Sequence, residues 1–232
     1  MSVISICIWI FFFTLLLVFI IIASKDVVVW LINLVCSKVY ESKFKARGVD
    51  FSLDISTKRL FNLPPYIRSP HAHVFRLLHR LKLEQGLNFV DCGSGKGNIL
   101  YEVSSFDFNV LGGIEINSNL HDICKKNLEL ILPDRQCKLI NKSVLECDTE
   151  FDSFDVFYCY GLFKLDQLHE FVSKLIVSKR RHVRPIWVIY TNLVSREPFI
   201  ENNFEEIYFF SRSSICDFQT VVFKHKDLCI PD

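Results

Sequence analysis

The sequence predicts an α/β fold in which a mostly parallel seven-stranded sheet ends in an antiparallel hairpin and follows one N-terminal transmembrane helix. Three observations lead to this prediction. Strand-like and helix-like segments alternate from residue 88 to residue 192, which is typical of parallel sheets with helices on both faces. Two strand-like segments with a short turn between them follow near the end of the chain. A long uncharged apolar segment stands at its start.

The apolar segment, VISICIWIFFFTLLLVFIIIA at residues 3–23, contains no charged residue. At about 1.5 Å per residue, a helix of this length spans about 30 Å, the thickness of the hydrocarbon core of a bilayer. A cleaved signal peptide is the main alternative, but it would have a basic start and a shorter apolar core. A buried core helix is rarely apolar on every side. We therefore expect an uncleaved transmembrane anchor over residues 1–24.

Basic residues flank this anchor on one side only. No Lys or Arg precedes it, and five follow it within residues 25–47. Because positively charged flanks stay in the cytoplasm, we expect a single-pass membrane protein with its C-terminal domain on the cytoplasmic side. Residues 27–36 are too short to span again and would continue the helix or lie in the interface. The predicted organisation is the anchor, a juxtamembrane segment at 25–59 and one globular domain at 60–232.

The elements of the globular domain follow from hydrophobic periodicity and from turn residues. The predicted strands are 88–92, 109–116, 137–143, 154–160, 184–192, 204–212 and 217–225. The predicted helices are 96–106, a helix capped by Asn117 or Ser118 that runs to about Leu130, and 164–177. Within residues 63–81, an amphipathic helix would bury Val74, Leu77, Leu78 and Leu81.

The composition argues against several classes of protein. A net charge of +1 gives no field that would steer the chain toward nucleic acid. The nine cysteines are scattered without any C-x-x-C pair, so we expect buried thiols in a reducing compartment rather than a disulfide or zinc framework. His71 and His73 have no Cys, Asp or Glu at a supporting spacing. No metal site is therefore expected.

The most informative stretch is NFVDCGSGKGNIL at residues 88–100, in which three glycines follow an acidic residue at the end of the first predicted strand. Glycines at such a turn let the backbone bend sharply and let a ligand approach the amides closely. The start of the next helix adds a partial positive charge for an anionic group. The stretch therefore predicts a nucleotide-type binding loop.

Two common nucleotide motifs do not fit this loop. A P-loop would have glycine where Val90 stands and Ser or Thr directly after Lys96. The dinucleotide fingerprint G-x-G-x-x-G would have glycine where Asn98 stands. The pattern that remains is D-x-G-x-G-x-G, formed by Asp91, Gly93, Gly95 and Gly97.

This pattern resembles the first motif of the class I S-adenosylmethionine-dependent methyltransferases, and the resemblance covers about residues 60–225. It implies a Rossmann-like fold and S-adenosyl-L-methionine as cofactor. In that family the glycine loop wraps the methionine part of the cofactor, and an acid that ends the second strand accepts from the ribose hydroxyls. Glu115 in GGIEINSN is placed for that role, since a carboxylate accepts two hydrogen bonds at once. The alternative for Glu115 is a charge that favours the dipole of the following helix.

The resemblance also implies which residues contact the cofactor. The segment LPPYIRSP is similar to the one that precedes the first motif in membrane-anchored and bacterial relatives, where a turn and a small hydroxyl residue open a helix that covers the cofactor. The implied set is Tyr66, Ser69, Asp91, Gly93, Ser94, Gly95, Gly97, Glu115, Ile116, Ser143, Val144 and Tyr160.

Two positions depart from the family pattern. Ser143 stands where the family often has an acid that accepts from the adenine amino group, so that contact would be weaker. YGLF at residues 160–163 stands where amino-methylating relatives have [DN]-P-P-[YF]. Without an Asn or Asp carbonyl there, methylation of adenine or cytosine amino groups is not expected, and no catalytic residue can be named. Methyl transfer needs little beyond alignment because the sulfonium is already a strong electrophile.

We therefore expect a membrane-anchored methyltransferase that acts on a protein lysine, a lipid-linked or a small-molecule acceptor. One alternative is a cofactor-binding but inactive membrane scaffold. Another is a nicotinamide-dependent oxidoreductase, which the glycine spacing disfavours. The basic run KRRHVR at residues 179–184 precedes the fifth predicted strand, opposite the cofactor loops. It is interpreted as a solvated turn, with contact to anionic lipid head groups as the alternative; nucleic acid is not an expected partner.

Overall fold

The computed structural model describes residues 11–15, 38–52, 71–210 and 219–226. The chain divides into two units, residues 1–46 and residues 47–232. In the first unit, residues 11–15 and 38–45 are helical. Apart from residues 11–15, the predicted anchor lies outside the described residues, as does the segment 27–36. A search of the described residues finds no helix that is both long and apolar enough to cross a membrane.

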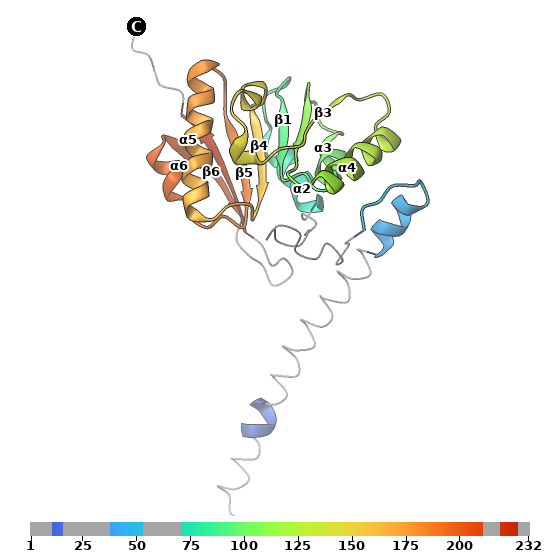
Figure 1. Cartoon of the computed structure of the whole chain (residues 1–232). Coiled ribbons are helices and arrows are strands. Elements are labelled where there is room, and N and C mark those ends of the chain that lie inside the picture. Colours follow the sequence, from blue (N-terminus) through green and yellow to red (C-terminus); the bar gives the residue numbers. More distant parts are fainter. Residues whose placement is uncertain (1–10, 16–37, 53–70, 211–218, 227–232) are drawn as a thin grey trace, which may run out of the picture. The chain divides into compact units, whose positions relative to one another are not determined.

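A seven-stranded sheet with the order β3-β2-β1-β4-β5-β7-β6 organises the second unit (Figure 1). The strands are β1 (Phe89–Cys92), β2 (Leu111–Ile114), β3 (Cys137–Ile140), β4 (Val156–Tyr160), β5 (Trp187–Thr191), β6 (Phe204–Phe210) and β7 (Thr220–His225). The first five strands pair in parallel, and β7 runs antiparallel between β5 and β6. The predicted Rossmann-like, mostly parallel sheet with a C-terminal antiparallel hairpin is confirmed. The strands are one to three residues shorter than predicted at several ends.

Helices cover both faces of this sheet. The helices α2 (His71–Leu81), α3 (Asn98–Val103) and α4 (Ser118–Ile131) pack on one face. The helices α5 (Leu165–Arg181) and α6 (Glu197–Glu201) and the short turns η1 (Val144–Glu146) and η2 (Thr149–Ser153) pack on the other. Figure 1 shows α5 and α6 toward the β6 end of the sheet and α4 toward the β3 end. The sequence predicted α2 within residues 63–81, as well as α3, α4 and α5. It did not predict α6, η1 or η2, which are too short to show a periodic pattern of apolar residues.

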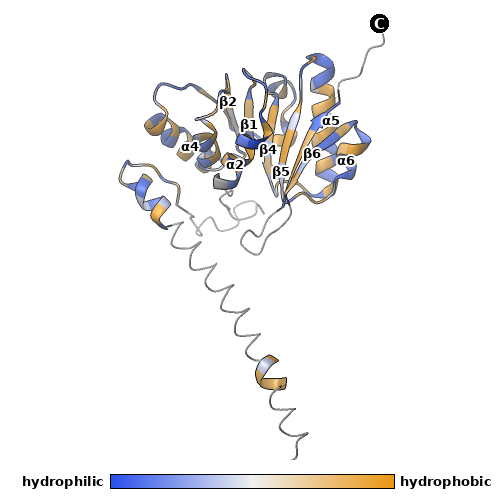
Figure 2. Cartoon of the chain, turned by 180° about the vertical axis from the view of Figure 1, so that it is seen from behind, coloured by the Kyte–Doolittle hydropathy of each residue, from blue (hydrophilic) through white to orange (hydrophobic). Residues whose placement is uncertain are grey.

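The helices are amphipathic, and the central strands β1, β4 and β5 are buried on both faces, as expected for a sheet covered on both sides. The edge strands β3 and β6 are partly exposed. Figure 2 shows the contrast between mostly hydrophobic strands and two-toned helices. In α2 the predicted buried side chains Val74, Leu77 and Leu78 are each at most 4% exposed. Leu120, Cys124 and Leu128 form the buried face of α4 in the same way.

The alternation of side chains between the two faces of the sheet determines the side on which Asp91 of β1 lies. Val90 and Cys92 pack into the cluster with α5, whereas Phe89 packs into the cluster with α2, α3 and α4. Because neighbouring strand residues point to opposite faces, Asp91 lies on the same face as Phe89. The fold thus places Asp91 at the end of the central strand, on the side of the helix that follows the glycine loop.

Candidate cofactor site

The loop between β1 and α3 turns at Gly93, Gly95 and Gly97, whose φ angles are 85°, 51° and 86°. Residues with a Cβ rarely adopt such angles. Gly97 is required for a second reason, because a Cβ there would lie 2.8 Å from the Sγ of Cys124 on α4. The spacing of the three glycines therefore follows from the turn itself and from the packing of α3 on α4.

Backbone amides of the same loop reach the neighbouring strand β2. The N–H groups of Gly93 and Ser94 both donate to the carbonyl of Ile114, at 2.8 and 3.0 Å. The N–H of Gly95 donates to Oε2 of Glu115 at 2.8 Å. The loop is thus attached to the end of β2 by three hydrogen bonds from consecutive residues.

The Glu115 carboxylate bridges the glycine loop and the start of α4. Its Oε1 accepts from the N–H of Asn117 at 2.8 Å, while its Oε2 accepts from Gly95. Burial raises its pKa, and the side chain is only 7% exposed. A carboxylate has about four acceptor positions, so two bonds leave room for a diol. The cap of α4 is Asn117, which accepts from the amides of Asn119 and Leu120. Of the two predicted caps, Asn117 and Ser118, Asn117 is the one observed. Glu115 accepts from the Asn117 amide, so its carboxylate also lies at the start of α4.

The second carboxylate of the site, Asp91, is 3% exposed. Burial and, after it, the charge of Glu115 raise the pKa of Asp91 to about 8. Within the described part of the chain, no hydrogen bond to its carboxylate is found. A buried carboxylate without a donor is costly unless a ligand supplies one. Asp91 therefore suits a ligand that brings a cationic group.

Ser94 and Ile116 have different roles on the loops around Glu115. Ser94 is 6% exposed, and its Oγ lies 2.9 Å from the position that a Cβ on Gly113 would take. Its side chain is thus directed at β2. Ile116 is 51% exposed directly after Glu115. Its side chain offers an open apolar surface at the edge of the site.

Ser143 and Val144 follow β3 and begin the turn η1. The Oγ of Ser143 accepts from the N–H of Leu145 at 3.3 Å, so this hydroxyl caps the turn. Val144 is buried in the cluster with α5. Its side chain is therefore used for packing. The other two residues of the implied set, Tyr66 and Ser69, lie outside the described residues.

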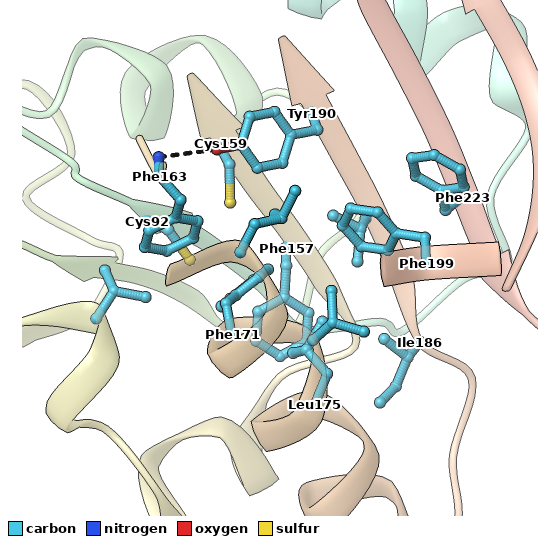
Figure 3. Close-up of a cluster of buried hydrophobic side chains, with 14 of the residues drawn as sticks. Cys92, Phe157, Cys159, Phe163, Phe171, Leu175, Ile186, Tyr190, Phe199 and Phe223 are labelled. Carbon is cyan, nitrogen blue, oxygen red and sulfur yellow. Dashed lines mark hydrogen bonds between the residues drawn. The ribbon is translucent and has the colours of Figure 1, made fainter. Parts of the chain in front are cut away.

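The segment after β4 is held by apolar packing. Tyr160, the last residue of β4, is half-buried, and burial raises its pKa. Phe163 is 7% exposed, and its N–H donates to the Oη of Tyr190 at 3.0 Å. Figure 3 shows Phe163 beside Cys159 and Tyr190 in the hydrophobic cluster, with this bond as a dashed line. A Cβ on Gly93 would lie 3.2 Å from Cδ1 of Leu162, so this segment meets the glycine loop.

Lys96, which the sequence analysis used only to reject a P-loop, is among the most buried polar side chains at 1% exposure. Its Nζ donates to Oδ2 of Asp50 at 2.9 Å and to Oγ of Ser52 at 3.2 Å. Asn127 on α4 joins the same group of contacts. Sequence reasoning missed these residues because Asp50 lies far from the loop in the chain and no motif links the two.

The basic run at residues 179–184 is largely engaged within the domain. Arg181 pairs with Asp148 at 2.8 Å and with Asp152 at 2.9 Å. The guanidinium of Arg184 donates to the carbonyls of Phe151 and Phe154, both at 2.8 Å. These contacts lie between α5 and the start of β5, opposite the glycine loop. The interpretation of the run as a solvated turn holds only in part: residues 180–183 are exposed, but the run begins in the last turn of α5 and Arg184 is partly buried.

The cysteines within the described residues are free thiols. They are Cys92, Cys124, Cys137, Cys147 and Cys159. Burial raises the pKa of the Cys92, Cys124, Cys137 and Cys147 thiols. Among the residues that the structure describes, no three His, Cys, Asp or Glu side chains gather as a metal site would require.

No protein-family model matches the sequence, and no curated protein matches it. Solved structures do match the fold. Magnesium protoporphyrin IX methyltransferase from Synechocystis PCC 6803, with bound SAM, is 12% identical with a TM-score of 0.52 over 67% of this chain and 77% of that one. Ribosomal protein L11 methylase from Lactobacillus delbrueckii subsp. bulgaricus is 13% identical with a TM-score of 0.54 over 70% of this chain and 81% of that one. The methyltransferase domain of bacterial CtHen1-C is 14% identical with a TM-score of 0.52 over 67% and 96%. The second unit of the chain therefore has the Rossmann-like fold of the class I S-adenosylmethionine-dependent methyltransferases.

Proposed function

We propose that the chain is an S-adenosylmethionine-dependent methyltransferase. The observation that carries this proposal is the pair of buried carboxylates at the ends of β1 and β2. Asp91 has a raised pKa and accepts no hydrogen bond from the described residues, and Glu115 keeps acceptor positions beyond its two backbone donors. The fold likeness to methyltransferases supports the same assignment.

The residues present suit this cofactor chemically. Asp91 would hold the cationic methionine part, because a positive group supplies the donor and charge that the buried carboxylate lacks. Glu115 would accept from the ribose diol. The exposed side chain of Ile116 would pack on the flat adenine ring. When bound, the cofactor supplies a methyl group on a positively charged sulfur. The chain would bind and align the two reactants and exclude water from them.

A binding experiment tests the cofactor. The full chain is titrated calorimetrically with S-adenosylmethionine, S-adenosylhomocysteine and NAD. We expect the first two to bind and NAD not to bind, because the third glycine comes one residue early for a dinucleotide fingerprint. Binding of NAD alone would favour an oxidoreductase and refute the methyltransferase proposal.

The acceptor is proposed to be a protein lysine, a lipid-linked molecule or a small molecule. The YGLF segment offers no Asn or Asp carbonyl to hold a nucleobase amino group. Labelled methyl groups from S-adenosylmethionine should enter membrane extracts in the presence of the protein. Extraction with organic solvent then separates lipid from protein acceptors. If the chain binds the cofactor but transfers no label to any fraction, the alternative of an inactive membrane scaffold is correct.

The proposed location is a membrane, with the globular domain on its cytoplasmic side and residues 1–24 as anchor. The support is the uncharged run at residues 3–23 and the basic residues that follow it. We expect the full chain to stay in the membrane pellet after a carbonate wash. Release of the intact protein into the soluble fraction would contradict the anchor, and protection of the domain from protease added to intact cells would support its orientation.

A further inference from the structure

The segment at residues 47–52 packs against α3 and α4 and contacts the glycine loop. Phe51 is 1% exposed, and its ring lies 6.4 Å from the ring of Tyr101 on α3. Val49 is 2% exposed. These residues stand 41 to 46 positions before Gly93, yet they belong to the same unit. Polar contacts also join residues 47–52 to the glycine loop, and these fix particular atoms at hydrogen-bond distance.

The side-chain amide of Asn127 joins residues 47–52 to the glycine loop. Its Oδ1 accepts from the N–H of Asp50 at 2.8 Å, and its Nδ2 donates to the carbonyl of Asp50 at 2.9 Å. The same Nδ2 donates to the carbonyl of Lys96 at 3.0 Å. Since Asn127 is 2% exposed, its amide is satisfied almost entirely by these backbone groups. The backbones of Asp50 and Lys96 are therefore fixed relative to α4.

Lys96 completes the connection from the loop. Its backbone carbonyl is bound by Asn127, and its ammonium is bound by Asp50 and Ser52. The hydrogen bond and charge of Lys96 help to lower the pKa of Asp50 against the opposing effect of burial. Asp50 therefore stays ionised at neutral pH, and the buried ammonium of Lys96 keeps a charged partner.

The position of Lys96 gives this contact a consequence for the cofactor loop. Lys96 stands between Gly95 and Gly97, both with positive φ. A loop with alternating glycines has high conformational entropy, and each residue that must be ordered costs about 1–2 kcal/mol. The side chain of Lys96 is directed at Asp50, while the N–H of Gly95 is directed at Glu115. The contact of Lys96 with Asp50 therefore restricts the loop backbone next to Gly95 and keeps the Gly95 amide on Glu115.

We propose that Lys96 is a positioning residue for the cofactor site, and that Asp50, Ser52 and Asn127 form the support that holds it. Residues 47–52 then belong to the cofactor site although they have no part in the glycine motif. This inference rests on the proposed function, because the ligand of the loop is taken to be S-adenosylmethionine or its product.

Lys96→Met tests the proposal in the full chain. Met keeps the unbranched apolar part of the side chain, and the Asp50 side chain, which is 46% exposed, can be hydrated after the ammonium is lost. Asn127→Ala removes the hydrogen bonds that hold the backbones of Asp50 and Lys96. Lys224→Met is the matched control, because it removes an ion pair of similar length, 3.0 Å to Glu84, on β7, which β4 and β5 separate from β1.

Two measurements separate positioning from general stability. Calorimetric titration with S-adenosylhomocysteine gives the affinity, and hydrogen exchange without ligand gives the protection of the Gly95 amide. We expect about tenfold weaker binding in Lys96→Met, equivalent to ordering about one more residue on binding. The Gly95 amide should exchange faster, while amides of β4 and β5 keep their protection. Lys224→Met should bind with wild-type affinity.

The outcomes are distinct. If the wild type binds S-adenosylhomocysteine and both Lys96→Met and Asn127→Ala bind it equally well, the positioning role is refuted and the proposed function stands. Equal loss of protection at Gly95 and in β4 and β5 would also refute it, because the contacts would then serve only the stability of the fold. If the wild type binds no S-adenosylhomocysteine, the proposed function fails; Gly95 exchange still decides whether Lys96 orders the loop.

Discussion

The carboxyl ends of β1 and β2 differ from those of β4 and β5 in what holds their loops. At β1 and β2, backbone amides of the glycine loop bind a carbonyl and the Glu115 carboxylate. At β4 and β5, Phe163 is inserted into the hydrophobic cluster and its amide binds Tyr190. The first region, which we call the cofactor half, keeps polar groups available next to its glycines. The second, which we call the acceptor half, is held mainly by apolar packing.

Under the proposed function, this difference separates the half that would bind the cofactor from the half that would bind the methyl acceptor. A cofactor that many enzymes share imposes the same carboxylates and the same glycines, so its binding loop is visible in a single sequence. An acceptor differs from enzyme to enzyme, and its binding region is free to change. The YGLF segment keeps the fold by packing its aromatic residue and carries no shared polar motif.

The largest effect is expected in the cofactor half, from Gly95→Val. Gly95 has a φ of 51°, which a β-branched residue rarely adopts, and its amide must stay on Glu115. The variant should bind S-adenosylmethionine at least about 100-fold more weakly, which corresponds to a loss of about 2.7 kcal/mol in binding free energy. Gly86→Val is the control away from the site, since Gly86 also has a positive φ, 78°, and precedes β1 at the opposite end of that strand. It should lose stability but keep cofactor affinity, both read by calorimetry and melting curves. Equal affinities of the two variants would remove the contrast.

A smaller but more specific effect is expected from Glu115→Ala. The variant loses the acceptor for the Gly95 and Asn117 amides and for the ribose, and a loss of about 2–3 kcal/mol corresponds to about 30- to 150-fold in affinity. Glu115→Gln should lose less, because it keeps one acceptor. Asp155→Ala is the matched control: Asp155 is a buried carboxylate that accepts a backbone N–H from Asn88 at 2.8 Å at the start of the strands. If Glu115→Ala only melts lower and binds normally, Glu115 serves the fold alone.

The pH dependence of the cofactor half should follow Asp91. Its pKa in the folded protein, about 8, lies above the usual value of about 3.9. Its contribution to stability is therefore fully present below about pH 4 and is lost as the pH rises through about 8. A cationic ligand prefers the ionised form, so affinity for S-adenosylmethionine should rise with pH up to about 8.

Asp91→Asn separates these two effects. Without ligand it should be more stable than the wild type at about pH 8 by roughly 1–3 kcal/mol, because the cost of a buried carboxylate without a donor is removed. Its affinity for S-adenosylmethionine should be weaker and nearly independent of pH. Melting curves and titrations between about pH 6 and 9 measure both properties around the raised pKa. A wild-type affinity that does not change with pH would show that Asp91 does not meet the cationic group.

The smallest effect belongs to the acceptor half. Tyr190→Phe removes the hydroxyl that accepts from the Phe163 amide and should destabilise the fold by about 1 kcal/mol. Cofactor affinity should not change, because neither residue touches the glycine loop or Glu115 in the described contacts. A clear loss of affinity in Tyr190→Phe would show that the two halves are coupled more closely than their separate packing indicates.

The fold and the turn of the glycine loop were largely predictable, for physical reasons that single residues illustrate. Strand and helix periods located the sheet, and the glycines located the turn because only a few residues tolerate its angles. Glu115 could be placed because it directly ends β2. The direction of Ser94 toward β2 and the burial of Val144 depend on packing between distant segments, which a local pattern does not contain.

The support of the glycine loop could not be predicted for the same reason. Asp50 and Asn127 are 77 residues apart, and only the folded chain brings them together. Lys96 looked like part of a rejected motif, although its burial and its ion pair give it a separate role. For the acceptor half, the sequence showed only that YGLF departs from the motif of amino-methylating enzymes. The missing Asn or Asp indicates which reaction is disfavoured, but it does not identify the acceptor.

The position of Asp50 also has a practical consequence for producing the protein in pieces. A soluble fragment that began at residue 60, where the sequence places the start of the globular domain, would lack the carboxylate that pairs with Lys96 and the aromatic ring beside Tyr101. Such a fragment would expose apolar surface on α3 and would be prone to aggregate. A fragment that begins at residue 47 keeps both contacts and is the better starting point for crystallisation and for screening of methyl acceptors.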